Sequence, residues 1–467
     1  MRTLKSVTPT PEQIGILSRA QPGIELIRGA AGSGKTTTAL LRLKSLIGFF
    51  SSKKRRTNDS SPIRVLVLTY NRTLRGYIDA LTQEQAKSFQ GVDLEVETFD
   101  RWALTSLGRP AILDNQVRLA KVRSLASNIP LSDSFISDEV EYAIGRFLPQ
   151  DLGDYVTSRR HGRGASPRME RALRVRLLNE VILPYESWKD SRSECDWNDL
   201  AVRLAAAPVS DPYDIVIADE AQDFSANQVR AILKHLAPVH SLTFVLDSAQ
   251  RIYARGFTWQ EVGISIRPER IRKLSQNYRN TIEIARLAAS LVKDVPIDDD
   301  GTIPDFNACT RSGRRPIVLR GRYSQQMEYA VAYIMSSVDL ANESVAFLHT
   351  QGGRWFDEAR RQLRLARLAF VEIARKADWP QGTENIALST LHSAKGLEFD
   401  HVILLGLSAE ITEHGQDEDD DKLMTLRRLL AMAVGRARDS VMLGYKPGEA
   451  SDLFKYIDED TYDCVDL

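Results

Sequence analysis

The segment Gly29–Thr36 reads GAAGSGKT and constrains the possible folds more than any other stretch of the chain. It matches the phosphate-loop pattern G-x-x-x-x-G-K-[ST] in full, between the strand-like run IELIR and the helix-like run TTTALLRLKSLI. In such a loop, backbone N–H groups turn towards phosphates, and the N-terminus of the helix adds its positive dipole end. The segment therefore predicts an α/β domain that binds a nucleotide.

The strand-like run YDIVIADEAQD carries further groups for a nucleotide, because it ends in Asp219 and Glu220. An acid at the C-terminal edge of a parallel strand is well placed to hold Mg²⁺, and a neighbouring glutamate can orient an attacking water. We expect Lys35 to reach the β- and γ-phosphates and Thr36 to hold Mg²⁺. This combination favours hydrolysis of the nucleotide over a binding switch.

Hydrolysis also requires positive charge near the γ-phosphoryl group, which arginine fingers commonly supply. Arg279 in SQNYRNT and Arg436 in AMAVGRARD are the two candidates in the second half of the chain.

Short apolar, β-branched runs recur between longer helical patterns and form two groups. The first extends from Ile24 to about Asp247, and the second from about Ile317 to Tyr445. Runs that are apolar on both faces and separated by helices indicate buried parallel strands. About 100 residues between EVETFD and YDIVIADE lack such runs and are typical of an α-helical insertion. We therefore predict an α/β fold with two parallel-sheet domains, divided as 1–104, 105–205 (insertion), 206–272 and 273–467.

Three charged segments stand out. Thr157–Arg176 holds seven arginines and one acid, and is either a solvated loop and helix face or an arm that contacts phosphates. SSKKRRTNDSSP is predicted to be a flexible loop between a helix and a strand. QDEDDDK is predicted to be a solvated acidic loop, because its carboxylates lack the fixed scaffold of a metal site.

The bulk composition narrows the class of protein. Lys plus Arg equals Asp plus Glu, 62 each, so any nucleic-acid surface must be a local patch. The three cysteines are far apart and fit neither a disulfide framework nor a zinc site, which favours a reducing compartment. No apolar run approaches the roughly 20 residues needed to span a bilayer, and the N-terminus lacks the apolar core of a signal peptide. We expect a cytoplasmic protein without a membrane partner.

In order along the chain, these segments resemble the motifs of superfamily 1A helicases, the UvrD/Rep/PcrA group. TPEQ resembles the motif that reads adenine, LTYNRTL and VETFDRWA resemble motifs that follow single-stranded DNA, and DEAQD is similar to the family's Mg²⁺ strand. DSAQRIY, QNYRNT, STLHSAKGLEFDHVIL and RRLLAMAVGRAR resemble the remaining motifs. The resemblance implies two RecA-like domains, a 1B-like insertion, and ATP and Mg²⁺ as cofactors.

The resemblance also implies roles for individual residues. The sets that follow include the residues already inferred from the motifs. The catalytic residues are Lys35, Glu220, Gln250, Arg279 and Arg436. The nucleotide contacts are Gln13, Gly29, Ala30, Ala31, Gly32, Ser33, Gly34, Lys35, Thr36, Thr37, Tyr278, Arg279, Gly396, Glu398 and Arg436, with Mg²⁺ on Thr36 and Asp219. The DNA contacts are Thr69, Asn71, Thr98, Phe99, Tyr253, Trp259, Thr390 and His392.

The stretch DSAQRIYARGFTW combines groups for both ligands. By resemblance, Gln250 senses the γ-phosphate, while Tyr253 and Trp259 lie towards stacked bases. The alternative for the two aromatic residues is burial in the core, and for His392 it is a structural hydrogen bond.

The chain departs from the family at three places. Leu246 replaces a glycine, and Ala431 and Gly435 replace the tyrosine and threonine of the last motif. Only about 35 residues separate SVAFLHT from STLHSAKGLEF, where full-length relatives carry a 2B domain that contacts the duplex.

The resemblance implies an ATP-dependent translocase or helicase that moves 3′ to 5′ on single-stranded DNA. The alternative is an ATP- and DNA-sensing regulatory subunit with a nuclease partner, as in anti-phage defence systems.

Overall fold

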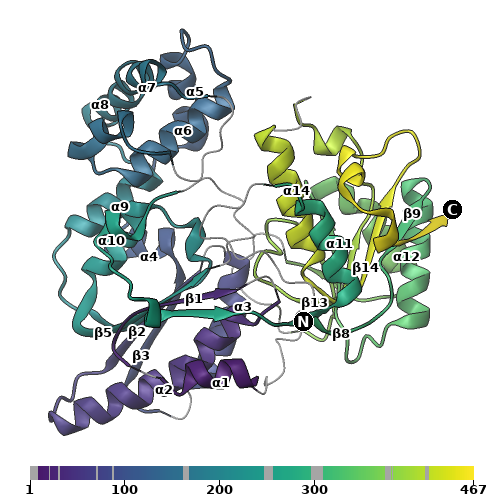
Figure 1. Ribbon diagram of the computed structural model, residues 1–467, viewed down its shortest axis with the longest axis horizontal. Coiled ribbons are helices and arrows are strands. Elements are labelled where there is room, and N and C mark those ends of the chain that lie inside the picture. Colours follow the sequence, from purple (N-terminus) through teal and green to yellow (C-terminus); the bar gives the residue numbers. More distant parts are fainter. Residues whose placement is uncertain are drawn as a thin grey trace.

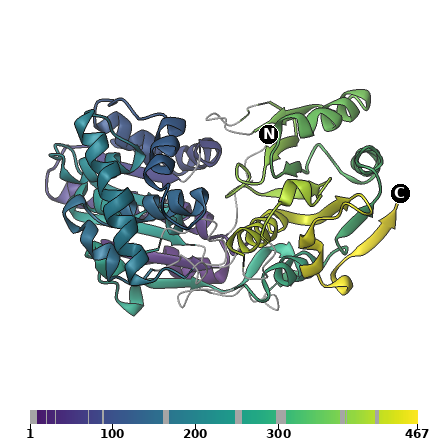
Figure 2. The same cartoon turned by 90° about the horizontal axis from the view of Figure 1, so that it is seen from above.

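The computed structural model describes residues 9–19, 21–29, 32–69, 72–86, 89–160, 168–246, 256–295, 309–373, 380, 382–415 and 420–467. These residues form two α/β bodies that lie side by side, with a helical insertion above the first of them (Figures 1 and 2). The fold class predicted from the sequence is confirmed.

The first α/β body is built on a six-stranded sheet in the order β3-β2-β4-β5-β1-β6, and its described strand pairs are all parallel. The strands are β1 (Gly23–Gly29), β2 (Ile63–Thr69), β3 (Val92–Thr98), β4 (Tyr213–Ala218), β5 (Leu236–Leu246) and β6 (Ile271–Leu274). Successive residues of β2, such as Leu66 and Val67, are buried on opposite faces. The sheet is therefore covered on both sides, as its unbroken apolar runs predict.

Helices from two parts of the chain cover these faces. One face packs against α1 (Pro11–Leu17), α2 (Lys35–Arg56) and α3 (Arg72–Ala86), and the other against α4 (Phe99–Ser106), α9 (Trp197–Ala206) and α10 (Ala226–Lys234). The prediction of a flexible loop at residues 51–62 is wrong for its first half, because α2 continues to Arg56. Lysine and arginine are good helix formers and complement the negative end of the helix dipole.

The helical insertion has a core of its own around Val140, Tyr155, Val181 and Tyr185. Its elements are α5 (Asn115–Leu125), α6 (Asp133–Arg146), η1 (Pro149–Val156), α7 (Arg171–Leu177), a π-helical turn η2 (Leu178–Ile182) and α8 (Leu183–Ser191). The wide turn η2 ends two residues before Pro184, which has no N–H to donate to the preceding turn.

The second α/β body is built on a seven-stranded sheet in the order β11-β12-β10-β13-β14-β9-β15. The strands are β9 (Ile317–Arg320), β10 (Val345–His349), β11 (Phe370–Glu372), β12 (Ile386–Thr390), β13 (Phe399–Leu404), β14 (Ala437–Tyr445) and β15 (Asp463–Asp466). The helices include α11 (Ile282–Val292), α12 (Tyr323–Ser337), α13 (Asp357–Leu365) and α14 (Asp421–Val434). A short pair, β7 (Asn277–Thr281) and β8 (Cys309–Arg311), joins this body to the first.

Two details bear on the boundaries expected from the sequence. β6 pairs with β1 through Leu274, so the expected boundary at residue 272 falls inside a strand of the first sheet. Between β10 and β12, the described residues form α13 and β11, and β11 pairs with β12. The described part of this interval, which also includes the short helix η8 (Gly353–Phe356), therefore packs on or pairs with the second sheet.

The acidic segment QDEDDDK is only partly described, because residues 416–419 lie outside the described ranges. Its end is not a loop: the Asp420 carboxylate caps α14 by accepting a hydrogen bond from Leu423 N, and Asp421 begins the helix. Among the described helices, none is long and apolar enough to cross a membrane.

Candidate nucleotide and DNA site

The phosphate loop runs from the end of β1 to the start of α2, at the C-terminal edge of the first sheet. Gly32 and Gly34 have φ values of 82° and 77°, a conformation that favours glycine. A Cβ at Gly34 would lie 2.6 Å from Gln13 Nε2. The buried Ser33 Oγ has no hydrogen-bond partner among the described residues. An orphaned hydroxyl in a loop that only glycine can form fits a phosphate cradle.

The remaining loop residues are only partly described. Gly29 ends β1, Lys35 begins α2, and Thr37 lies in its first turn, whereas Ala30 and Ala31 lie outside the described ranges.

Gln13 lies beside this loop because α1 packs against α2. Its Oε1 accepts a hydrogen bond of 2.9 Å from Thr10 N, which completes the N-terminal cap of α1. Its Nε2 approaches Gly34 O at 3.4 Å. The amide is thus held between the helix cap and the phosphate loop, where it was predicted to read adenine.

Thr36 and Asp219 face each other across the predicted metal position. Thr36 Oγ1 lies 3.1 Å from both carboxylate oxygens of Asp219, which directly follows β4. Burial, and then the charge of Glu220, raise the pKa of Asp219 to about 7. The buried carboxylate of Asp219 and the hydroxyl of Thr36 face the same point and fit Mg²⁺, which prefers oxygen ligands. The cation would also neutralise the negative charge of the two neighbouring acids.

Glu220 is held in a left-handed backbone conformation, with φ of 52°. This conformation costs a non-glycine residue roughly 1 kcal/mol or more and often marks functional sites. Burial favours the neutral acid, but the charges of Lys395, Arg436 and Lys35 together lower the pKa of Glu220. The carboxylate is therefore kept ionised, as a group that orients water requires.

Lys395 is a site residue that the sequence analysis did not select. Its Nζ lies 3.7 Å from Glu220 Oε2 and pairs with the buried carboxylate of Asp223. Lys395 comes from the loop between β12 and β13, so this pair links the two α/β bodies. Its position in SAKGLEF, between the predicted site residues His392 and Gly396, is the feature from which it could have been predicted.

The second body brings its predicted nucleotide residues together. Arg279 in β7 forms an ion pair with Glu398, and its Nη1 lies 3.4 Å from Gly435 O. Arg436 follows α14, is 3% exposed, and lies near enough for its charge to lower the pKa of Glu220. Two predicted nucleotide contacts, Arg279 and Glu398, thus neutralise each other in this structure.

Two other predicted contacts flank this cluster. Tyr278 is half-buried in β7 and donates a hydrogen bond to Gln276, and Gly396 has φ of 83° in the loop before β13.

The predicted DNA residues of the first body are mostly buried. Thr69 ends β2, and Thr98 caps α4 by accepting a hydrogen bond from Arg101 N at 3.4 Å. Phe99 is 2% exposed, with its ring 5.6 Å from that of Trp102. Phe99, a predicted DNA contact, thus lies on the core face of α4 in this structure, and its contact with DNA stays a prediction.

The other DNA candidates differ in surroundings. Thr390 Oγ1 accepts a hydrogen bond of 3.2 Å from Ser393 N. Burial, and then the charge of Lys395, lower the pKa of His392. The half-buried Trp259 ring packs 4.8 Å from that of Phe244, which is the core alternative left open by the sequence. Asn71, Gln250 and Tyr253 lie outside the described residues.

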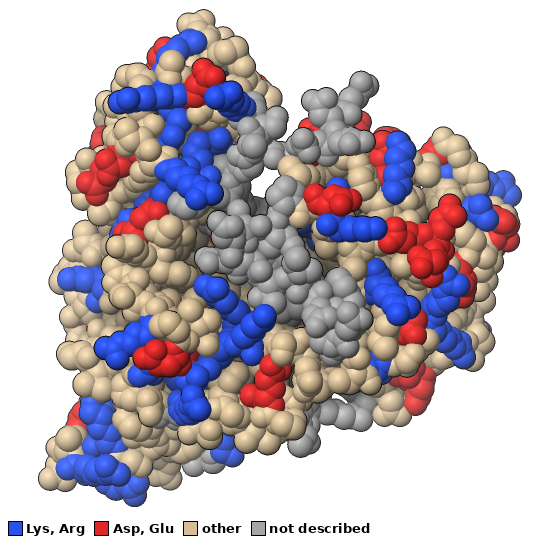
Figure 3. All heavy atoms as spheres, viewed as in Figure 1, with Lys and Arg blue, Asp and Glu red and all other residues tan. Residues whose placement is uncertain are grey.

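The arginines of the segment Thr157–Arg176 are divided between structural and exposed positions. Arg160 forms two hydrogen bonds with the buried Glu139, Arg174 donates to Ser158 O, and Arg176 pairs with Glu180. The exposed arginines of this segment are Arg159, Arg168 and Arg171, and Arg163 lies outside the described ranges. Figure 3 shows basic and acidic side chains intermixed over the insertion. An arm that contacts phosphates therefore has fewer arginines to offer than the sequence indicates.

Comparisons with known proteins find similarity to helicase domains. A family model described as the UvrD/REP helicase N-terminal domain matches residues 11–258, more than half of the chain, and one described as the UvrD-like helicase C-terminal domain matches residues 360–447. A solved structure of the C-terminal domain of a possible DNA helicase from Lactobacillus plantarum WCFS1 is 18% identical and covers 40% of this chain and 98% of its own, with a TM-score of 0.30. Comparison with curated proteins finds no match.

Proposed function

Because the chain belongs to the UvrD/REP helicase family of ATP-driven DNA helicases, we propose that it hydrolyses ATP to move along single-stranded DNA from 3′ to 5′. The observation that carries this proposal is the convergence of both α/β bodies on Glu220. The first body supplies the phosphate loop and Asp219, and the second supplies Lys395 and Arg436. A site divided between two bodies can be assembled and dismantled as they move.

Mg·ATP, when bound, supplies the γ-phosphoryl group that is transferred to water. The residues of the chain hold and polarise it: the phosphate loop with Lys35 binds the phosphates, and Thr36 with Asp219 holds the cation. Glu220 orients the attacking water. Arg279 and Arg436 neutralise charge on the phosphoryl group from the second body, which requires Arg279 to leave or share Glu398.

The loop between β12 and β13 connects hydrolysis to DNA. Thr390 and His392, which we propose to contact the strand, lie at its start, and Lys395, Gly396 and Glu398 follow on the same loop. A shift of this loop against Glu220 therefore moves the DNA contacts as well. Repeated closing and opening of the two bodies would then advance the grip along the strand.

The first test is ATP hydrolysis by the purified chain, with and without single-stranded DNA, at low and moderate salt. We expect strong stimulation by DNA that weakens as salt rises, because phosphate contacts release counterions. Lys35→Ala should abolish hydrolysis. Its matched control is Lys44→Ala, an exposed lysine on the same helix α2, which should hydrolyse ATP normally. Normal turnover by the Lys35 variant would disprove the site assignment.

A second candidate function follows from the interval between β10 and β12. Its described residues form α13 and β11 of the second sheet, in place of a domain that could contact duplex DNA. This arrangement favours a regulatory subunit in which ATP and DNA switch a nuclease partner. Strand displacement by the isolated chain supports the motor. DNA-stimulated hydrolysis without displacement, together with a stable co-purifying nuclease, supports the regulatory subunit.

A further inference from the structure

An ion pair joins the helical insertion to the first α/β body. Arg146, the last residue of α6, donates from Nε to Glu261 Oε2 at 2.8 Å and from Nη2 to Glu261 Oε1 at 2.9 Å. Glu261 lies in the short helix η5 (Trp259–Val262). The side chain of Arg146 is 5% exposed and that of Glu261 is 29% exposed. Burial favours the neutral acid, but the hydrogen bonds from Arg146 lower the pKa of Glu261.

On the side of the first body, Glu261 fixes the start of η5. Its Oε1 also accepts hydrogen bonds from Thr258 N at 3.2 Å and Thr258 Oγ1 at 2.9 Å, which close the N-terminal cap. The next residue, Trp259, is the predicted base contact whose ring packs on Phe244. Glu261 therefore fixes the N-terminal end of η5, where Trp259 lies.

On the side of the insertion, Arg146 fixes the start of the arginine-rich segment. Its Nη1 donates to Arg159 O at 2.7 Å and to the hydroxyl of Tyr142. The following residue, Arg160, pairs side-on with Glu139 in the core of the insertion. One guanidinium thus contacts both the segment that follows DSAQRIY and the segment that carries the exposed arginines.

Helix α10 holds this joint from below and connects it to the nucleotide site. Arg230 donates from Nη1 to Arg146 O at 2.7 Å and from Nη2 to Glu261 O at 3.1 Å. Asn227 Nδ2 donates to Ile144 O at 2.8 Å and to Phe147 O at 2.9 Å. Because α10 begins three residues after Asp223, a displacement of the proposed catalytic acids would be transmitted to both partners of the pair.

We propose that Arg146 and Glu261 are positioning residues, which hold Arg159, at the described start of the arginine-rich segment, in register with Trp259 so that DNA bound on the insertion stimulates ATP hydrolysis. This inference rests on the proposed DNA-driven ATPase. A planar guanidinium is required, because only a fork of N–H donors can bind the carboxylate side-on while also reaching Arg159 O. A lysine would keep the charge and lose this geometry.

The test measures ATP turnover against the concentration of a single-stranded oligonucleotide for Arg146→Gln, Arg146→Lys, Glu261→Gln and the exchanged pair Arg146→Glu/Glu261→Arg. We expect the DNA concentration for half-maximal stimulation to rise about tenfold in the first three variants, with unchanged turnover in the absence of DNA. The exchanged pair should recover part of this loss. The matched control is Arg123→Gln, which breaks the exposed pair Arg123–Asp133 in the same insertion and should change the value by less than about twofold.

Wild-type turnover that does not respond to DNA would disprove the proposed function itself. With a responsive wild type, the inference fails if folded Arg146→Lys and Glu261→Gln respond to DNA as the wild type does. It also fails if turnover without DNA falls in parallel with stimulated turnover, because that result indicates a general structural role. Arg146→Gln is the variant most prone to unfolding, so the decision rests on the two conservative variants and on thermal unfolding measured beside them.

Discussion

Two buried lysines of this chain have the same chemistry and different consequences. Lys189 and Lys395 are both 2% exposed and both lie among carboxylates. Lys189 contacts Glu186, Asp196 and Asp199 at 2.8–3.1 Å, all within the neighbouring helices α8 and α9. Lys395 contacts Asp223 and Glu220, which belong to the other α/β body. The first cluster joins elements that stay together, whereas the second joins bodies that separate in the proposed cycle.

The difference shows how a buried charge acquires a function. Taking a lysine and its partners out of water is expensive wherever it occurs, and good geometry only repays the cost. Where α8 of the insertion meets α9 of the first body, the described ion pairs balance this cost within adjoining helices. Between the two bodies, Lys395 and its carboxylates would exchange each other for water if the bodies open as proposed, so the free energy of this ion pair would help to set their separation.

The largest expected effect breaks the permanent cluster. Lys189→Met leaves the buried Asp196 and the partly buried Glu186 and Asp199 without their shared counter-charge, and we expect it to reduce the free energy of unfolding by about 3–5 kcal/mol. Urea denaturation followed by circular dichroism measures the change. Lys44→Met, an exposed lysine, is the control. A loss below about 1 kcal/mol would show that the insertion does not depend on this charge.

A smaller effect on free energy, and a different observable, is expected at the joint between the two bodies. Lys395→Met removes the leading positive charge that lowers the pKa of Glu220, and we expect DNA-stimulated ATP turnover to fall by about 10²-fold. Its free energy of unfolding should change less than that of Lys189→Met, because Glu220 and Asp223 regain water when the bodies open. Equal losses of stability in the two variants would remove the distinction drawn here.

The smallest effect is a pH dependence in the permanent cluster. Burial raises the pKa of Glu186 to about 7 from 4.5, against the opposing charge of Lys189. Because the folded state binds this proton more tightly than the unfolded state, the contribution to stability is full below pH 4.5 and is lost as pH rises through about 7. The free energy of unfolding of the wild type should therefore fall between about pH 5 and 8, and Glu186→Gln should make this fall smaller by about 1 kcal/mol. Thermal unfolding at both pH values tests this, with the exposed Glu180→Gln as control.

Contiguous motifs account for what the sequence predicts well. GAAGSGKT specifies a strand, a glycine-dependent turn and a helix within a few residues, and the acids after β4 follow from the rule for parallel strand ends. Lys395 and the pair Arg146–Glu261 could not be found in this way. Their partners lie more than 100 residues apart, and only the strand order brings them together.

The folded chain adds information about two other sequence-based expectations in a similar way. The motif predicts that Phe99 contacts DNA, and the register of α4 turns its ring towards Trp102 and Phe224. For Thr157–Arg176 the sequence leaves open a solvated loop and helix face or an arm that contacts phosphates. In the fold, Arg160 and Arg174 have partners inside the insertion, so fewer arginines are available for such an arm. Residue type indicates what a side chain can do, but its neighbours in the folded chain determine which group it meets.

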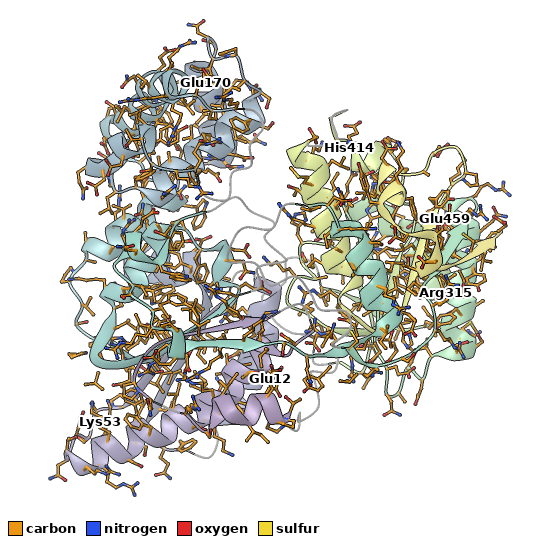
Figure 4. The ribbon with its side chains drawn as sticks, in the orientation of Figure 1. Glu12, Lys53, Glu170, Arg315, His414 and Glu459 are labelled. Carbon is orange, nitrogen blue, oxygen red and sulfur yellow. The ribbon has the colours of Figure 1, made fainter. Side chains whose placement is uncertain are left out.

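The passage from β6 to β7 has a mechanical consequence. Ser275 and Gln276 alone separate these strands, and the carboxylate of Glu12, labelled in Figure 4, accepts hydrogen bonds from Ser275 N and Ser275 Oγ at 2.9 and 2.8 Å. The covalent connection between the bodies is therefore a short pivot fastened to α1. Rotation about a pivot displaces each atom in proportion to its distance from the axis. In the proposed cycle, Tyr278 and Arg279, adjacent to the pivot, would therefore move least, and a small adjustment there would become a longer displacement at the far rim of the second body.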